Sequence, residues 1–116
     1  MTIKGVQVIS AESWIYVMDE KDLKEESPVS VSVNRTSMLL VKKSGKIYAV
    51  SNKCAHMECP LSRGTLDGYT IKCPCHDWIF DIRTGEFLMA KEIKIPVFKC
   101  MVSDQKIMID MEGVNL

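Results

Sequence analysis

Apolar and polar residues alternate with a period of two along much of this chain. The clearest case is residues 29–33, Val-Ser-Val-Ser-Val, in which every second residue is apolar and β-branched. Such alternation predicts strands with one face in a core and the other in water. The other short runs that we expect to form strands are Trp14–Val17, Ser37–Val41, Lys46–Val50, Thr70–Lys72, Trp78–Ile82, Glu86–Met89, Val97–Val102 and Lys106–Met111.

Turn-forming residues separate these runs and indicate antiparallel hairpins. Asp67-Gly68 is the strongest two-residue turn signal, and weaker ones occur at Lys43–Lys46, Arg83–Glu86 and Ser103–Lys106. The sequence therefore predicts an all-β fold. Only Asp19–Ser27 departs from the pattern, because seven of its nine residues are charged. We expect a solvated connection there, or a short helical turn, rather than a patch that docks a partner.

Size and composition limit the protein to one small domain. Its 116 residues, 47% of them hydrophobic, suit a single domain over 1–116 with one core. Fifteen basic residues balance fifteen acidic ones, which argues against nucleic acid as a partner. The longest apolar run, Trp14–Met18, has five residues, whereas a membrane span needs about 20. The first residues hold no apolar stretch of signal-peptide length, so we expect a cytoplasmic protein.

Five cysteines in a reducing compartment favour metal ligation or redox chemistry over structural disulfides. Cys54 and His56 form a Cys-x-His pair, Cys73 and His76 form a Cys-x-x-His pair, and sixteen residues separate the two pairs. Asp67-Gly68 lies between the two pairs, so they fall on loops at one end of a predicted hairpin. We therefore expect the two loops to face each other and to hold one metal centre.

Two thiolates and two imidazoles suit either a tetrahedral zinc ion or a [2Fe-2S] cluster whose two irons have different ligands. Zinc sites usually place two to four residues between the first paired ligands. A Cys-x-His pair followed by a Cys-x-x-His pair is unusual for zinc, so a structural zinc module is the weaker alternative.

The spacing of these pairs resembles that of the Rieske iron-sulfur family. The resemblance continues through Cys73-Pro74-x-His76, then Phe80-Asp81 and Thr84-Gly85-Glu86, and spans nearly the whole chain. It is to the small soluble ferredoxins, of the oxygenase-associated or archaeal stand-alone type. The resemblance implies three small antiparallel sheets and a cluster-binding subdomain, at about 52–82, formed by two loops.

The resemblance also implies the ligands and the activity. Cys54 and Cys73 would ligate the buried iron of the cluster, and His56 and His76 the outer iron. The protein would be an electron carrier and not an enzyme, a monomer or weak oligomer that passes one electron from a reductase to a terminal oxidase or oxygenase. Alternatives are a Rieske subunit of a larger respiratory or oxidase complex, and a regulatory subunit without electron transfer.

Cys59 and Cys75, one in each loop, resemble the loop-bridging disulfide of the high-potential Rieske proteins of respiratory complexes. We expect them to form that bridge, which would persist in the cytosol if the cluster buried it.

The residues after His76 depart from the high-potential pattern of a glycine, a hydroxyl residue and, two positions later, a tyrosine. Here these positions are Asp77, Trp78 and Phe80. Phenylalanine has no hydrogen-bond donor to stabilise added negative charge. We therefore expect a reduction potential in the lower half of the family's range, about −150 to +300 mV. Asp77 tolerates a positive φ better than most residues. Its carboxylate would either lower the potential further or simply face water as part of a turn.

Three residues outside this segment complete the predictions. Met57, next to His56, would give an exposed apolar docking spot. Pro96, in a stretch that resembles the family's third loop, would shield the cluster from water. Cys100 lies in an alternating run away from both loops and is expected to be a small core residue.

Overall fold

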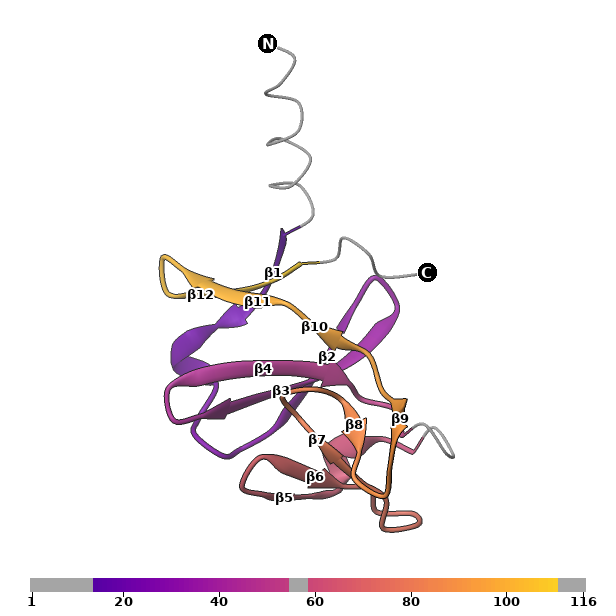
Figure 1. Ribbon diagram of the computed structural model, residues 1–116. Helices are drawn as coiled ribbons and strands as arrows, with labels where there is room; N and C mark the ends of the chain where they lie inside the picture. Colours follow the sequence, from indigo (N-terminus) through magenta and orange to yellow (C-terminus); the bar gives the residue numbers. More distant parts are fainter. Residues whose placement is uncertain (1–13, 55–58, 111–116) are drawn as a thin grey trace.

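The structure, a computed structural model, describes residues 14–54 and 59–110, and Figure 1 shows it as a ribbon. Within these ranges the chain forms strands and two single turns of 3-10 helix, η1 (Glu20–Asp22) and η2 (Leu61–Arg63), so no described helix has the length to span a membrane. The strands are β1 (Trp14–Asp19), β2 (Val29–Val33), β3 (Thr36–Lys43), β4 (Lys46–Ser51), β5 (Thr65–Asp67), β6 (Thr70–Lys72), β7 (Ile79–Asp81), β8 (Glu86–Phe87), β9 (Ala90–Lys94), β10 (Val97–Phe98), β11 (Cys100–Ser103) and β12 (Lys106–Asp110).

These strands form three antiparallel sheets, which confirms the predicted fold class. The first sheet has the order β1-β12-β11, the second β10-β4-β3-β2, and the third β5-β6-β7-β8-β9. In Figure 1 the second sheet lies between the other two. The ends of the chain's described part thus pair in the first sheet, whereas the third sheet is built from one continuous segment.

Strand β3 lies at the centre of the molecule because both of its faces are buried. Met38 and Leu40 belong to a hydrophobic core shared with the first sheet, which we call the base core. Leu39 and Val41 belong to a second core shared with the third sheet, which we call the site-side core. All four side chains are fully buried. A strand buried on both faces explains why this segment is apolar without interruption from Met38 to Val41.

Most of the predicted strands are present, but three predictions about their limits were wrong. The strand expected over Glu86–Met89 ends at Phe87. The hairpin between β5 and β6 turns at Gly68 and Tyr69, because Asp67 pairs with Thr70, so the turn lies one residue later than expected. The run Val97–Val102 is not one strand. It divides into β10, which pairs with β4, and β11, which pairs with β12.

The charged segment Asp19–Ser27 forms the 3-10 turn η1 and then returns to the second sheet. It buries Leu23 in the base core. The carboxylate of Glu25 accepts hydrogen bonds from the backbone N–H groups of Ser44 and Gly45, at 2.9 and 2.8 Å. These bonds lower the pKa of Glu25. The segment is therefore an exposed connection that also caps the turn between β3 and β4.

Candidate metal centre

Two loops approach each other beside the short strands of the third sheet. The first loop leaves β4 and reaches η2, and the second joins β6 to β7. A disulfide between Cys59 of the first loop and Cys75 of the second connects them, with 6.5 Å between the Cα atoms. This confirms the predicted pairing. In the polypeptide Cys59 is partly exposed and Cys75 is exposed.

The two cysteines predicted as ligands lie under these loops. Cys54 is 1% exposed and Cys73 is fully buried, and both belong to the site-side core. The sulfur of Cys73 lies within 4.8 Å of the sulfurs of both Cys59 and Cys75. The imidazole of His76, by contrast, belongs to an exposed residue. The second loop therefore presents one sulfur inward and one ring outward.

Asn52 connects the start of the first loop to β3 and to η2 through hydrogen bonds. It is the only buried polar residue in the part of the chain that the structure describes. Its amide nitrogen donates to Ser37 Oγ at 3.1 Å, and its amide oxygen accepts from the backbone N–H of Ser62 at 2.7 Å. The backbone N–H of Asn52 donates to the carbonyl of Ser37, and its carbonyl accepts from the N–H of Leu61. Sequence reasoning missed Asn52, because an asparagine before a loop carries no signal of burial.

The second loop is shaped by its backbone. The N–H of Cys73 donates to the carbonyl of Trp78 at 2.7 Å, and the N–H of Asp77 donates to the carbonyl of Cys73 at 3.1 Å. Asp77 has φ +60°, which confirms the expected positive φ. Gly64 was not predicted to matter. A Cβ at Gly64 would collide with the backbone carbonyl of Lys72, the residue before Cys73, so only glycine lets η2 pack this closely.

Aromatic side chains pack where the second loop enters the third sheet. Trp78 stacks on Phe87 with ring centroids 4.1 Å apart and planes 4° apart. Phe80 is fully buried and lies 5.6 Å from Phe87, centroid to centroid. Phe80 thus belongs to the site-side core, and the partly exposed Trp78 packs against it.

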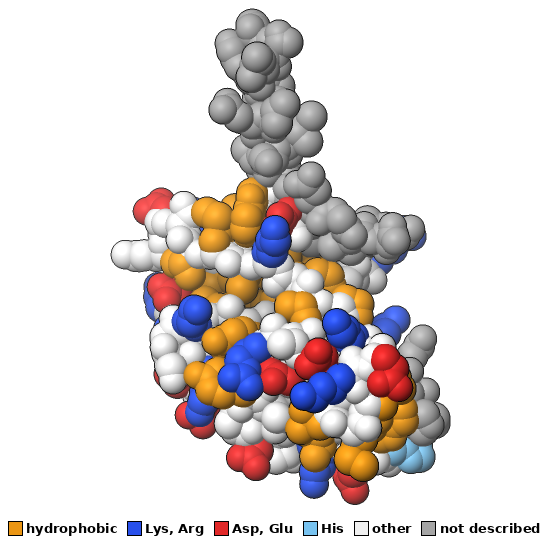
Figure 2. Space-filling model, in the orientation of Figure 1, with side chains coloured by type: hydrophobic (Ala, Val, Ile, Leu, Met, Phe, Trp, Pro, Cys, Tyr) orange, Lys and Arg blue, Asp and Glu red, His pale blue; other side chains and the backbone are white. Residues whose placement is uncertain are grey.

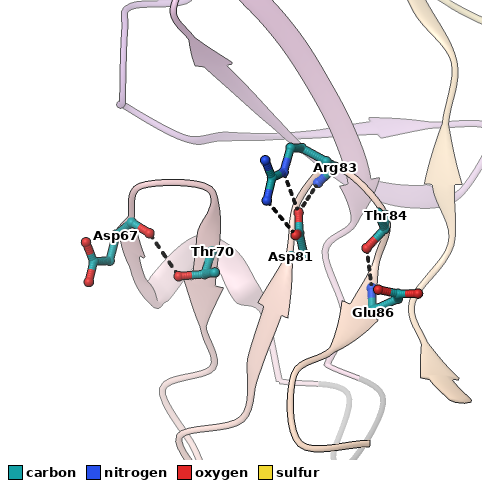
Figure 3. A network of polar contacts seen from close by, with 6 residues as sticks. All are labelled: Asp67, Thr70, Asp81, Arg83, Thr84 and Glu86. Carbon is teal, nitrogen blue, oxygen red and sulfur yellow. Dashed lines mark hydrogen bonds and ion pairs between the residues drawn. The ribbon is translucent and has the colours of Figure 1, made fainter. Parts of the chain in front are cut away.

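A polar network stabilises the turn that follows β7 (Figure 3). Arg83 forms a two-bond ion pair with Asp81, at 3.0 and 2.9 Å. The Arg83 hydrogen bonds lower the pKa of Asp81. The Arg83 guanidinium also lies over the ring of Tyr69, 4.5 Å from its centroid, which connects two turns of the third sheet. A Cβ at Gly85 would collide with the carbonyl of Ile95, which accounts for the glycine of Thr84-Gly85-Glu86.

The remaining predicted residues are only partly accounted for. His56 and Met57 lie outside the described residues. Pro96 is exposed, and its carbonyl accepts from the N–H of Ser51 at 2.9 Å, which places it beside the start of the first loop. Cys100 lies apart from the loops and packs partly buried against the base core, as expected. Its thiol donates to the carbonyl of Ile47 at 3.0 Å, and burial raises its pKa to about 11.

The order of these residues and the three-sheet fold match a known family. Residues 13–99 match the model of the Rieske [2Fe-2S] domain. The chain belongs to the Rieske [2Fe-2S] domain family. The cofactor of this Rieske protein is accordingly a [2Fe-2S] cluster, and the donors found here suit it. Soft cysteine sulfurs are buried and an imidazole is exposed, as a cluster with unlike irons requires.

Relatives of this Rieske chain include ferredoxin components of dioxygenase systems. It is 34% identical over 104 residues to the ferredoxin component of the naphthalene 1,2-dioxygenase/salicylate 5-hydroxylase systems of Ralstonia sp., covering 87% of this chain and 98% of that protein. It is 29% identical over 75 residues to sulredoxin of Sulfurisphaera tokodaii, covering 65% and 69%. The ferredoxin of carbazole 1,9a-dioxygenase from Nocardioides aromaticivorans IC177 has a similar structure, with a TM-score of 0.77, 27% identity and coverage of 84% and 96%.

Proposed function

We propose that this protein is a ferredoxin that carries one electron at a time from a reductase to a terminal oxygenase or oxidase. The observation that carries the proposal is that the chain covers 98% of a ferredoxin component of an oxygenase system. That match extends across all three sheets. The proposal makes the protein a cytoplasmic carrier without an active site of its own, working as a monomer or weak oligomer.

We assign Cys54 and Cys73 to the inner iron of the cluster and His56 and His76 to the outer iron. The burial of both cysteines and the exposure of His76 support this division. The bound cluster supplies a site that gains and loses one electron. The protein's part is to keep water from the sulfur side, through the site-side core, and to present an imidazole edge at the surface where a partner can approach.

The residues around the second loop support a potential in the lower half of the Rieske range. Phe80 is fully buried and has no donor for a cluster or ligand sulfur. Asp77 adds a carboxylate next to His76. Phe80→Tyr keeps the ring and adds one hydroxyl, so voltammetry of the loaded variant should give a higher potential than the parent. An unchanged potential would contradict this explanation of the tuning.

Partner docking is proposed to depend little on long-range electrostatics. The whole chain carries no net charge, and basic and acidic side chains lie next to one another on the face shown in Figure 2. Interspersed charges give a weak field beyond about 10 Å at 0.1 M salt. The rate of electron transfer to a partner should therefore fall only slightly as salt is added.

Spectroscopy of the purified protein tests the central proposal. Full-length protein expressed with iron and sulfur supply should be red-brown and, after reduction, give the electron paramagnetic resonance signal with low average g that mixed histidine and cysteine ligation produces. Stopped-flow mixing with an oxygenase component should then show oxidation of the reduced protein. A colourless protein that holds one zinc ion would refute the proposal in favour of the zinc module.

The disulfide supports a second candidate, a Rieske subunit of a larger respiratory or oxidase complex. Cys59 and Cys75 form the loop-bridging pair that the high-potential members are expected to have. Copurification of the tagged protein with a large assembly would favour this candidate, and a free carrier in the same extract would favour the ferredoxin.

A further inference from the structure

Three cysteine sulfurs gather at the junction of the two loops. The Sγ atoms of Cys59, Cys73 and Cys75 all lie within 4.8 Å of one another. Two of them form the disulfide, and the third belongs to a proposed cluster ligand. In the disulfide state only Cys73 of this trio is able to donate a thiolate to a metal.

Opening the disulfide changes the number of donors at this point. A dithiol reductant delivers two electrons and two protons, so that the Cys59–Cys75 bond becomes two thiols while the reductant becomes a disulfide. Cys75 is exposed and Cys59 partly exposed, so such a reductant has access from solvent. Binding of a cation to the three sulfurs then releases their protons, which is the usual accompaniment of thiolate ligation.

The loops keep the three sulfurs near one another by bonds other than the disulfide. The N–H of Cys54 donates to the carbonyl of Cys59 at 2.9 Å, and Lys53 pairs with Pro60 as an isolated bridge. In the second loop, the N–H of Cys73 forms a hydrogen bond with the carbonyl of Trp78, and Cys75 is two residues from Cys73. Reduction therefore leaves a preformed set of soft donors, which suits a thiophilic cation such as Zn²⁺.

We propose that reduction of the Cys59–Cys75 disulfide creates a three-thiolate site, formed by Cys59, Cys73 and Cys75, that binds a thiophilic cation and excludes the iron-sulfur cluster. The exclusion rests on the proposed function, because Cys73 is claimed by both sites. The disulfide thus reserves Cys73 for the cluster. Whether the disulfide forms before or after metal loading then decides which metal the protein holds.

The test uses the full-length chain before cluster loading, with the disulfide either intact or reduced and the reductant removed without oxygen. Each form is titrated with Zn²⁺, and its free thiols are then alkylated and mapped by peptide mass spectrometry. We expect the reduced form to bind Zn²⁺ at least about tenfold more tightly than the disulfide form. Zn²⁺ should protect Cys59, Cys73 and Cys75 from alkylation, while Cys100 is modified equally with and without the ion.

Two variants separate this site from the proposed cluster site. Cys54→Ser removes one assigned cluster ligand and leaves the trio intact, so its reduced form should retain the tight Zn²⁺ site. Cys59→Ser should lose it, and Cys100→Ser is the matched cysteine control. Equal affinity of the reduced and disulfide forms of the unsubstituted chain, or protection of Cys54 and Cys73 alone, would overturn the proposal, whether or not the variants fold.

A final arm tests the competition. Iron and sulfide added to the disulfide form should give the Rieske resonance signal, and the same addition to the reduced, Zn²⁺-loaded form should not. No signal from either form would count against the proposed function, while the Zn²⁺ titration would still decide the three-thiolate site. A full signal from the Zn²⁺-loaded form would show that the two sites do not exclude each other.

Discussion

The two faces of β3 support two different cores. The base core on one face is aliphatic except for Phe98. Apart from the two-residue strand β10, its strands pair over four or more residues. The site-side core on the other face contains both buried cysteines and the aromatic rings of Phe80 and Phe87. Its strands β5 to β8 have only two or three residues each.

This difference indicates how the molecule divides its tasks. Long paired strands with a continuous apolar face are stable through burial alone. The third sheet has little strand pairing, so it depends on cross-links between loops. Those that the structure shows are the Cys59–Cys75 disulfide, the Asn52 bonds and the Arg83 contacts, and the proposed cluster would add another. Substitutions in the site-side core should therefore reduce metal binding by the protein, whereas comparable substitutions in the base core should leave metal binding unchanged.

The largest expected difference is between two cysteines, one from each core. Cys73→Ser should reduce the iron content of purified protein to near zero, because a buried thiolate ligand is lost. Cys100→Ser is the control, because Cys100 packs against the base core. The serine keeps a donor for the carbonyl of Ile47, so this variant should retain full iron content. Iron and sulfide analysis of both variants measures the effect. Equal loss from the two would contradict the assignment.

The second comparison removes one fully buried side chain from each core. Phe80→Ala should lower the free energy of unfolding by about 3–5 kcal/mol and Leu40→Ala by about 2–5 kcal/mol. Denaturant unfolding gives these values. The resonance signal of the loaded protein should weaken or broaden for Phe80→Ala and stay unchanged for Leu40→Ala. If Leu40→Ala disturbed the signal as much, the two cores would not be independent.

How far the sequence predicted this division depends on the range of each interaction. The alternation of apolar and polar residues predicted β2 and the strands around it, because this pattern depends only on neighbouring positions in the sequence. The spacing from Cys54 to His76 predicted two facing loops. The resemblance of Cys59 and Cys75 to the family's disulfide predicted the bridge between these loops. Asn52 and Gly64 escaped prediction because their roles arise from distant partners, Ser37 Oγ and the carbonyl of Lys72. The division of Val97–Val102 between two sheets is likewise a tertiary effect.

The third comparison replaces one glycine near the loops and one glycine far from them with alanine. Gly64→Ala would collide with the carbonyl of Lys72, and overpacking of this kind costs about 1–3 kcal/mol. It should also lower cluster occupancy, because the displaced backbone leads directly into Cys73. Gly45→Ala meets open space in the β3–β4 turn, and its φ of +79° costs about 1–2 kcal/mol without an effect on occupancy. Iron content per folded protein distinguishes the two outcomes.

The smallest expected effect concerns Asp81, whose pKa is lowered by its hydrogen bonds to Arg83. A carboxyl group with a depressed pKa in the folded state contributes stability above its unfolded pKa of about 3.9 and loses it as the pH falls through the lower folded value. Asp81→Asn should therefore unfold more easily than the parent at pH 7, by less than either core substitution, since Arg83 is half exposed. The gap between the two proteins should narrow below about pH 4 and close in stronger acid.

A neighbouring aspartate gives the control for that pH dependence. Asp67 lies in the same sheet, and the bond that it forms with Thr70 uses its backbone carbonyl rather than its carboxylate (Figure 3). Asp67→Asn makes the same change of charge without removing an ion pair. Denaturant unfolding from pH 7 to pH 3 should show the narrowing gap only for Asp81→Asn. If Asp67→Asn produced the same profile, net charge rather than the Arg83 pair would explain it, and the turn after β7 would not be one of the cross-links on which the site-side core depends.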